Sequence, residues 1–301
     1  MYVIIGATGH TGRAAADKLL DNGKKVRVVA RNADHLTPLV SKGAEPFAAN
    51  ATDKNAMTKA FAGARAVYVM IPPDLSTHDH LAYANQVSEA LATAIEKNGV
   101  KHAVLLSSIG ADKAEKTGPI VGLHRLEERL NKISGLNTLH LRAAYFMENT
   151  LGQADAIAQM GSVAGPLRPE LKFPFIAARD IGNFAGDALL RLDFTSHQVQ
   201  ELHGQRDVSY GEIATVLGKA IGKPDLKYSR ITAEQFRGVL VRMGMSENSA
   251  GLLTEMTQSM DSGFIKPLEA RSTRNTTPTS YEAFVAESFL PIYQKKRPAA
   301  A

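Results

Sequence analysis

The stretch "IIGATGHTGR", residues 4–13, places three glycines, Gly6, Gly9 and Gly12, at intervals of three near the start of the chain. The apolar run at residues 2–5 precedes it, and an alanine-rich run with helical spacing follows it. This order predicts a buried strand, a tight turn and a helix. Residues 25–30 (KVRVVA) supply the next strand, so that the unit closes within about 30 residues, the size of a βαβ crossover.

Each glycine has a separate reason to stand in this turn. Gly6 permits the sharp change of direction, Gly9 lets a pyrophosphate approach the backbone, and Gly12 lets helix and strand pack closely. The free N–H groups of the first helical turn then face the anion, and Thr8 and Thr11 can add hydroxyl donors. We therefore predict a dinucleotide-binding loop, with an ordinary turn that binds nothing as the alternative. The predicted binding residues are Gly6, Ala7, Thr8, Gly9, His10, Thr11 and Gly12.

Arg31 indicates which dinucleotide is bound. An NAD site places Asp or Glu at the end of the second strand to bind the ribose 2′-hydroxyl. Here that position carries Arg31, followed by Asn32, and the next acidic residue after them is Asp34. A guanidinium pairs with a 2′-phosphate, whereas a carboxylate repels it. We therefore expect NADP(H), held by Arg31 and Asn32, rather than NAD; a solvated surface arginine is the alternative.

Strands and helices continue to alternate as far as about residue 150, which predicts an α/β fold: a Rossmann-type doubly wound parallel sheet covered on both faces. Further strands are expected at residues 44–49, 66–71, 101–107 and 137–142, with helices at residues 54–61 and 79–97 and another that Pro119 begins as an N1 residue.

After residue 150 the alternation ends, and we expect a smaller, mainly helical substrate domain. The NADP-binding domain is assigned to residues 1–150, completed by residues 175–195, and the smaller domain to residues 151–174 and 196–301. Asp180 is expected to cap a helix. Capping boxes are expected at Ser209 with Glu212, Thr232 with Gln235, and Thr279 with Glu282.

The composition excludes several classes of protein. The 301 residues contain no Cys, which excludes disulfides, thiolate nucleophiles and Cys-based metal sites and favours a cytoplasmic location. We expect neither a signal peptide nor a membrane helix. The formal charge is +5, but it is scattered, and its densest run, residues 295–297, lies in a Pro/Ala tail. We therefore expect no direct nucleic-acid binding.

The acid catalyst of most short-chain reductases, a Tyr followed four residues later by Lys, has no counterpart here, because none of the eight tyrosines has Lys at that distance. The corresponding helix reads "GLHRLEERL", residues 122–130, with His124 and Glu128 four apart. Glu128 is interpreted as a solvated helix residue.

Phrases along most of the chain resemble the NmrA-like family of atypical short-chain dehydrogenases. They are GATGHTG (residues 6–12), VVARNADHL (28–36), YVMIPP (68–73), LLSSIGA (105–111), HRLEE (124–128) and LRAAYFMEN (141–149). ARDIGNFA (178–185) and the segment 202–223 add to the resemblance. The glycine loop and Arg31 are its most specific elements. The family includes NmrA redox-sensing regulators, quinone reductases and triphenylmethane reductase.

The resemblance implies further site residues. Met70, Ile71 and Pro72 would line the adenosine and ribose, and Tyr145 and Phe146 would lie near the nicotinamide. Independently of the resemblance, Ser107 lies at the predicted end of the fifth strand, where it would bind the nicotinamide amide or the substrate, or only complete the strand. Several quinone reductases of the family carry His at the position of His124, which implies either a proton donor or a mere hydrogen-bond partner.

Two other groups of residues have competing interpretations. His78, Asp79 and His80 are residue types that often bind metal ions. They lie at the predicted start of a helix, however, where the charge of Asp79 is favourable to the helix dipole, and we therefore expect no metal. The methionines at positions 243, 245, 256 and 260 are interpreted as core, with an apolar substrate pocket as the alternative.

We conclude from the sequence that the chain is an NADPH-dependent reductase, with His124 as candidate catalyst, which transfers hydride to a small apolar acceptor such as a quinone or aromatic carbonyl. The alternative is a non-catalytic NADP sensor of the NmrA type that acts through a protein partner. A homodimer is compatible with either function.

Overall fold

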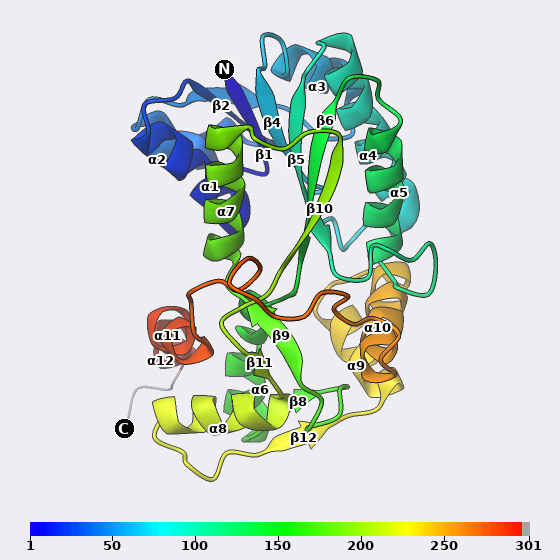
Figure 1. Cartoon of the computed structure of the whole chain (residues 1–301). Helices are drawn as coiled ribbons and strands as arrows, with labels where there is room; N and C mark the ends of the chain where they lie inside the picture. The colour runs from blue at the N-terminus through cyan, green and yellow to red at the C-terminus, as the bar shows by residue number, and fades with distance from the viewer. Residues whose placement is uncertain (297–301) are drawn as a thin grey trace.

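Seven parallel strands form the central sheet of the computed structural model, which describes residues 1–296 (Figure 1). Their order is β10-β6-β5-β4-β1-β2-β3. Residues 297–301, the end of the basic run and the Pro/Ala tail, lie outside the described residues. The strands are β1 (Tyr2–Ile5), β2 (Val26–Ala30), β3 (Glu45–Ala48), β4 (Ala66–Val69), β5 (His102–Ser108), β6 (Asn137–Ala143) and β10 (His197–Leu202).

Helices cover both faces of this sheet, as Figure 1 shows. On one face lie α1 (His10–Asp21), α2 (Thr37–Val40), which follows the short 3₁₀ turn η1 (Ala33–Leu36), and α7 (Ala178–Arg191). On the other lie α3 (Lys54–Ala60), α4 (His80–Lys97) and α5 (Ile120–Asn131). The doubly wound Rossmann-type fold predicted from the sequence is therefore confirmed.

The chain order reverses at β1, which pairs with β2 on one side and β4 on the other. The predicted α/β alternation agrees with the observed elements to within one or two residues, except that Pro119 is the N-cap of α5 rather than its first residue. One strand of the central sheet was not predicted: β10, from the segment assigned to the smaller domain, pairs with β6.

The remaining elements lie beyond the carboxyl ends of the strands (Figure 1). One small sheet has the order β11-β9-β7 and the other joins β12 to β8. Their strands are β7 (Tyr145–Phe146), β8 (Val163–Gly165), β9 (Phe173–Ile176), β11 (Asp207–Val208) and β12 (Tyr228–Arg230). The helices are η2 (Met147–Thr150), α6 (Gln153–Met160), α8 (Tyr210–Ala220), α9 (Ala233–Arg242), α10 (Glu247–Asp261), α11 (Tyr281–Phe284), η3 (Val285–Phe289) and α12 (Leu290–Lys296).

Capping boxes begin two of these helices as predicted, at Ser209 of α8 and Thr232 of α9. The third prediction is wrong. Ser280, not Thr279, caps α11, and its hydroxyl accepts the hydrogen bond of the Ala283 amide. Thr279 is unavailable because its amide and hydroxyl both donate to a carboxylate of α7, described below.

Helices α1 and α7 pack unusually closely because α7 presents glycines to α1. A Cβ at Gly182 would lie 2.3 Å from the carbonyl oxygen of Thr11, and one at Gly186 would lie 2.8 Å from the Lys18 side chain. Only residues without a side chain fit at these two positions. The close contact fixes α7, and therefore its amino end, relative to the glycine loop that begins α1.

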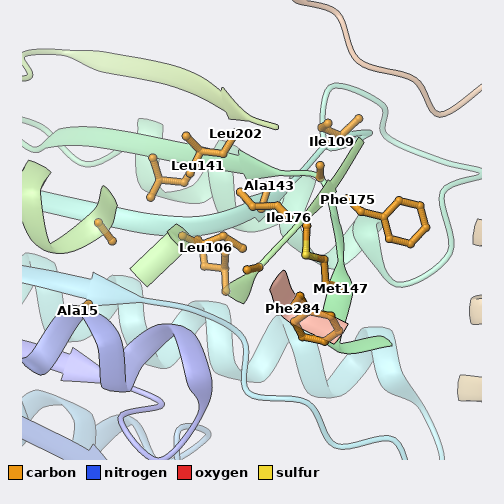
Figure 2. Close-up of a cluster of buried hydrophobic side chains, with 14 of the residues drawn as sticks. Ala15, Leu106, Ile109, Leu141, Ala143, Met147, Phe175, Ile176, Leu202 and Phe284 are labelled. Carbon is orange, nitrogen blue, oxygen red and sulfur yellow. The ribbon is translucent and has the colours of Figure 1, made fainter. Parts of the chain in front are cut away.

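A continuous hydrophobic core joins the central sheet to the region beyond it (Figure 2). Leu106, Leu141 and Leu202 from β5, β6 and β10 lie in the same cluster as Phe175 of β9 and Phe284 of α11. A second cluster fills the space under α3, α4 and α5. Within residues 1–296, no helix combines the length and the apolar character needed to cross a membrane.

Candidate functional site

The glycine loop between β1 and α1 is a tight turn. Gly6 has a φ of 69°, in the left-handed region that favours glycine, and its carbonyl oxygen accepts a hydrogen bond from the Gly9 amide at 2.9 Å. A Cβ at Gly6 would also lie 2.5 Å from the sulfur of Met70. The backbone conformation therefore favours glycine at position 6, and a Cβ there would also have to displace the Met70 side chain.

Helix α1 begins at His10 with its first amides uncapped. Its N-cap is Gly9, which has no side chain to accept them, and the first turn contains no acidic residue. A Cβ at Gly12 would lie 2.4 Å from the Gly6 carbonyl oxygen, so that Gly12 lets the helix pack directly on the loop. The result is a group of backbone donors at the positive end of a helix dipole, which suits an anion.

A cavity of about 490 Å³ opens in front of this loop, at the carboxyl ends of β1, β2 and β4. It lies where the strand order reverses, the expected position of a ligand in a doubly wound sheet. The predicted site residues that line it are Gly6, Thr8, Gly9, His10, Thr11, Arg31, Met70, Pro72 and Phe146. The predicted residues that do not line it are Ala7, Gly12, Asn32, Ile71, Ser107, Tyr145 and His124.

Arg31 lies exposed at the edge of this cavity, just past the end of β2. Asn32 is oriented differently, because its side-chain oxygen accepts the Asp34 amide at 2.9 Å and caps η1. The sequence did not indicate Tyr83 of α4, which lines the cavity and donates its hydroxyl to the Pro72 carbonyl at 2.8 Å. Burial raises the pKa of Tyr83, and Arg31 is close enough to oppose that rise.

Residues after β3 also line the cavity and were missed. They are Ala49, Asn50 and Ala51. The strand-end rule that indicated Arg31 applies equally to β3. The weak strand pattern of β3 (EPFA) gives little indication of where that strand ends.

A second, larger cavity of about 750 Å³ lies beside the first, between α6, α9 and α10. Tyr145 lines this cavity, Phe146 lines the first, and Asn149 lines both. Burial raises the pKa of the Tyr145 phenol, against hydrogen bonds with Tyr210 and Asn149 that lower it. The short segment 145–149 therefore forms the boundary between the two cavities.

Of the four methionines interpreted as core, Met260 of α10 is buried there. Met256 of α10 packs against the core and also lines the larger cavity. Met243 and Met245, between α9 and α10, line the larger cavity. Helical spacing cannot distinguish a cavity wall from a core, because both require an apolar face.

His124 lies on α5, half-buried, with its Nδ1 2.9 Å from the carbonyl oxygen of Ala111. Because a carbonyl only accepts, Nδ1 carries the hydrogen, and Nε2 is the nitrogen left for other partners. Glu128, one turn further along the helix, is exposed as expected.

Ser107 is buried away from the first cavity, which its neighbour Leu106 lines instead. Its hydroxyl donates to Glu127 of α5 at 2.5 Å. The same carboxylate receives two hydrogen bonds from Arg142 of β6, at 3.1 and 2.6 Å. The hydroxyl of Ser107 is thus part of a buried network behind the site.

Glu148, which the sequence reasoning missed, fixes the start of α7. Both its carboxylate oxygens accept the Ala178 amide, at 3.0 and 3.1 Å, and burial raises its pKa. Asp180 was predicted to be this cap, and that prediction is wrong: the N-cap is Ala177, and Asp180 lies in the first turn. Its carboxylate instead accepts the amide and hydroxyl of Thr279, at 3.0 and 2.8 Å.

Asp79 caps α4 by accepting the Ala82 amide at 2.9 Å. Its neighbour His80 is buried, and the His80 amide donates to Asn248 of α10 at 2.9 Å. In the part of the chain that the structure describes, no three His, Asp or Glu side chains gather closely enough to hold a metal ion.

Comparison with known proteins shows which family this geometry belongs to. The sequence model of the NmrA-like family matches residues 2–284. The NAD(P)H azoreductase of Xenophilus azovorans is 29% identical over 260 residues, which are 85% of this chain and 86% of that protein. The (4-alkanoyl-5-oxo-2,5-dihydrofuran-3-yl)methyl phosphate reductase of Streptomyces griseus is 27% identical over 243 residues, 80% of each chain.

Among solved structures, the NADPH-dependent quinone oxidoreductase QOR2 of Escherichia coli, complexed with NADPH, superimposes with a TM-score of 0.75. The two sequences are 20% identical, and the match covers 96% of this chain and 100% of that one. At this level of identity the likeness concerns the fold.

Proposed function

This chain belongs to the NmrA-like family, and from that premise we propose that it is an NADPH-dependent oxidoreductase that reduces a small apolar acceptor such as a quinone or an aromatic carbonyl. The observation that carries the proposal is the contact between two cavities at Asn149, one with a glycine loop and a cation, the other large and apolar. The two relatives described above are named as reductases, one of them with NAD(P)H in its name, which supports the proposal.

The residues of the first cavity fit NADP(H). The uncapped amides of α1 and the side-chain-free surface of Gly9 would hold the pyrophosphate. Arg31, whose guanidinium has no ion-pair partner among residues 1–296, would pair with the 2′-phosphate. Phe146 and Asn149 would lie beside the nicotinamide.

Bound NADPH supplies a hydride, and the reaction balances as NADPH + H⁺ + quinone → NADP⁺ + hydroquinone. The apolar wall of the second cavity would hold the acceptor ring beside Asn149 and would keep water from much of its surface. The proton has to come from a side chain or from water. We keep His124 as the proposed donor through Nε2; since it lines neither cavity, a water would have to carry the proton.

A sensor of the NmrA type needs only the cofactor cavity. An enzyme also needs room for its acceptor, which the second cavity of about 750 Å³ beside the first would provide. For this reason we propose an enzyme rather than a regulator.

The test is a comparison of NADPH and NADH, first by fluorescence titration and then as donors with a panel of quinones and aldehydes. In Arg31→Glu we expect the Kd for NADPH to rise at least tenfold, because a pair is replaced by repulsion, with little change for NADH. Lys25→Glu is the matched control, since Lys25 is an exposed cation just before β2, the strand whose other end leads to Arg31. Equal Kd values for the two cofactors in the unmodified protein would remove Arg31 from the site.

Measurements of turnover distinguish an enzyme from a sensor and test the role of His124. Reduction of at least one quinone or aldehyde is expected, and none across the panel would favour the sensor. His124→Ala should lower kcat about a hundredfold if His124 donates the proton. Unchanged kcat would assign the proton to another source.

A further inference from the structure

The larger cavity has an apolar interior and an apolar rim. Met160 of α6 and Met243 at the end of α9 stand 60% and 66% exposed, among the most exposed large apolar side chains of residues 1–296. Both line the cavity, together with Leu240 and Leu253, which lie on α9 and α10. Such a surface suits a flat, apolar ring system.

Most polar groups around this cavity are already engaged. The side-chain amide of Gln153 accepts from the Ala164 amide and donates to the Ala164 carbonyl, both at 2.9 Å. The nearby cation Arg237 pairs with Glu247 at 2.9 Å, and Arg230 pairs with Asp261 at 2.8 Å.

Arg242, the last residue of α9, differs from these arginines. It lines the cavity, and within residues 1–296 it has neither an ion pair nor a side-chain hydrogen bond. Its guanidinium folds back over Gly238, one turn earlier, where a Cβ would lie 3.4 Å from the Arg242 Nη1 atom. Gly238 also lines the cavity. The Arg242 guanidinium thus lies against the backbone of Gly238, in the wall of an apolar cavity.

One carboxylate, Glu234, also lines the cavity, two turns before Arg242 on the same helix. Eight residues of helix separate their backbones by about 12 Å. The Arg242 guanidinium folds back by one turn toward Glu234, but within residues 1–296 the two side chains form no ion pair.

We propose that Arg242 determines specificity, by selecting acceptors that combine an apolar aromatic body with an anionic substituent such as a sulfonate or carboxylate. The body fills the methionine- and leucine-lined interior, and the anion pairs with the guanidinium at the rim. A planar guanidinium suits this task because it can donate two parallel hydrogen bonds to such an oxyanion. The inference rests on the proposed function for its meaning in catalysis, but the binding preference can be measured without turnover.

The binding test uses two fluorescent probes with nearly the same ring system. 8-Anilinonaphthalene-1-sulfonate carries the anion, and N-phenyl-1-naphthylamine lacks it. In Arg242→Gln the Kd for the sulfonate should rise about threefold to fivefold, the size of an exposed ion pair, while the Kd for the neutral probe stays within twofold. The difference between the probes should shrink at 0.5 M salt, because the pair is exposed to solvent.

Two further variants serve as controls. Arg65→Gln removes an exposed positive charge just before β4, at the opposite end of the sheet, and should alter neither Kd. Glu234→Gln should slightly lower the Kd for the sulfonate probe, because it removes a charge that repels the sulfonate. Thermal unfolding of each variant shows that the fold is intact. Equal changes for both probes in Arg242→Gln, or the same loss in Arg65→Gln, would overturn the proposal.

The turnover test compares 1,2-naphthoquinone with its 4-sulfonate as acceptors for NADPH oxidation. Arg242→Gln should raise KM threefold to fivefold for the sulfonate alone, with kcat and the KM for NADPH unchanged. If neither quinone is reduced but the sulfonate probe still discriminates, the proposed function fails and the assignment of Arg242 stands. If both quinones are reduced and Arg242→Gln changes their KM values equally, the assignment of Arg242 fails and the proposed function stands.

Discussion

Replacement of Glu127 tests whether Ser107 belongs to the structure or to the cofactor site. Glu127 is 4% exposed and accepts hydrogen bonds from Ser107 at 2.5 Å and from Arg142 at 3.1 and 2.6 Å. The Arg142 side chain is 13% exposed. In Glu127→Ala a largely buried guanidinium therefore loses its counter-charge, and a buried hydroxyl loses its acceptor.

The cost follows from that desolvation. Removing one partner of a buried ion pair costs about 3–5 kcal/mol, and the lower end applies here because Arg142 keeps some contact with water. At about 2–4 °C per kcal/mol, a loss of about 3 kcal/mol lowers Tm by about 6–12 °C. The double variant Glu127→Ala, Arg142→Leu should recover most of the lost stability, since no unpaired buried charge remains. Ser107→Ala should cost only about 1 kcal/mol.

Urea and thermal unfolding at pH 7 give the stabilities, and NADPH fluorescence titration of the same samples gives the Kd. Ser107→Ala is expected to leave the Kd for NADPH unchanged, because the hydroxyl faces Glu127 and not the cavity. The reasoning is refuted if Glu127→Ala loses less than 1 kcal/mol while Ser107→Ala weakens NADPH binding more than tenfold. That result would return Ser107 to the cofactor site.

Three other predictions test separate parts of the fold. Gly12→Ala places a Cβ 2.4 Å from the Gly6 carbonyl oxygen, so the loop must shift and NADPH should bind at least tenfold more weakly by titration; an unchanged Kd would contradict the packing argument. Burial lowers the pKa of His140 from its ordinary 6.5 to about 4, so the fold favours the neutral ring. This stabilisation is present above pH 6.5 and is lost as pH falls toward 4, by up to about 3 kcal/mol; unfolding curves between pH 7 and 4 should show that loss, and His140→Gln should show less of it. Asp180→Ala leaves the buried amide and hydroxyl of Thr279 without their acceptor, which should cost about 2 kcal/mol in urea unfolding; a loss below 0.5 kcal/mol would count against the contact as a stabilising one.

Five of the six strands that the sequence predicted, β1, β2, β4, β5 and β6, lie inside the sheet and are mostly buried, as strands covered on both faces of a parallel sheet must be. The sixth, β3 (EPFA), forms one edge of the sheet, and most of its residues are exposed. Strand β10, which forms the other edge, was missed because it reads HQVQEL and its first residues are exposed. Its place in the sheet depends on pairing with β6 rather than on an apolar pattern of its own. The apolar pattern is thus clear in the interior strands and weak in both edge strands, one of which was missed.

The two cavities also differ in how far their residues could be predicted from the sequence. The glycine loop and Arg31 were predictable because a dinucleotide loop is local: its turn, its helix end and its second strand lie within about 30 residues. The lining of the larger cavity comes from α6, α9 and α10, brought together only by tertiary packing. Met256 and Met260 lie one turn apart on α10, yet one lines the cavity and the other is core.

Contacts between distant segments were the least predictable. Asp180 has the residue type and position of a helix cap, and Thr279 the residue type of another, but the two bind each other across 99 positions of sequence. Each residue type is a common helix cap. The local sequence, however, could not show that Asp180 and Thr279 would hydrogen-bond each other instead of capping their helices.

The segment 145–149 connects the two cavities. In strand β7, successive side chains point to opposite faces, so Tyr145 enters one cavity and Phe146 the other. Pairing of β7 with β9 holds the start of the segment, and the Glu148 carboxylate binds the amino end of α7, which the glycines of α7 fix against α1. The glycine loop that begins α1 and the wall of the larger cavity are therefore joined through a few short, tightly packed connections. A cofactor positioned by the loop is positioned, by the same contacts, against whatever fills the apolar cavity.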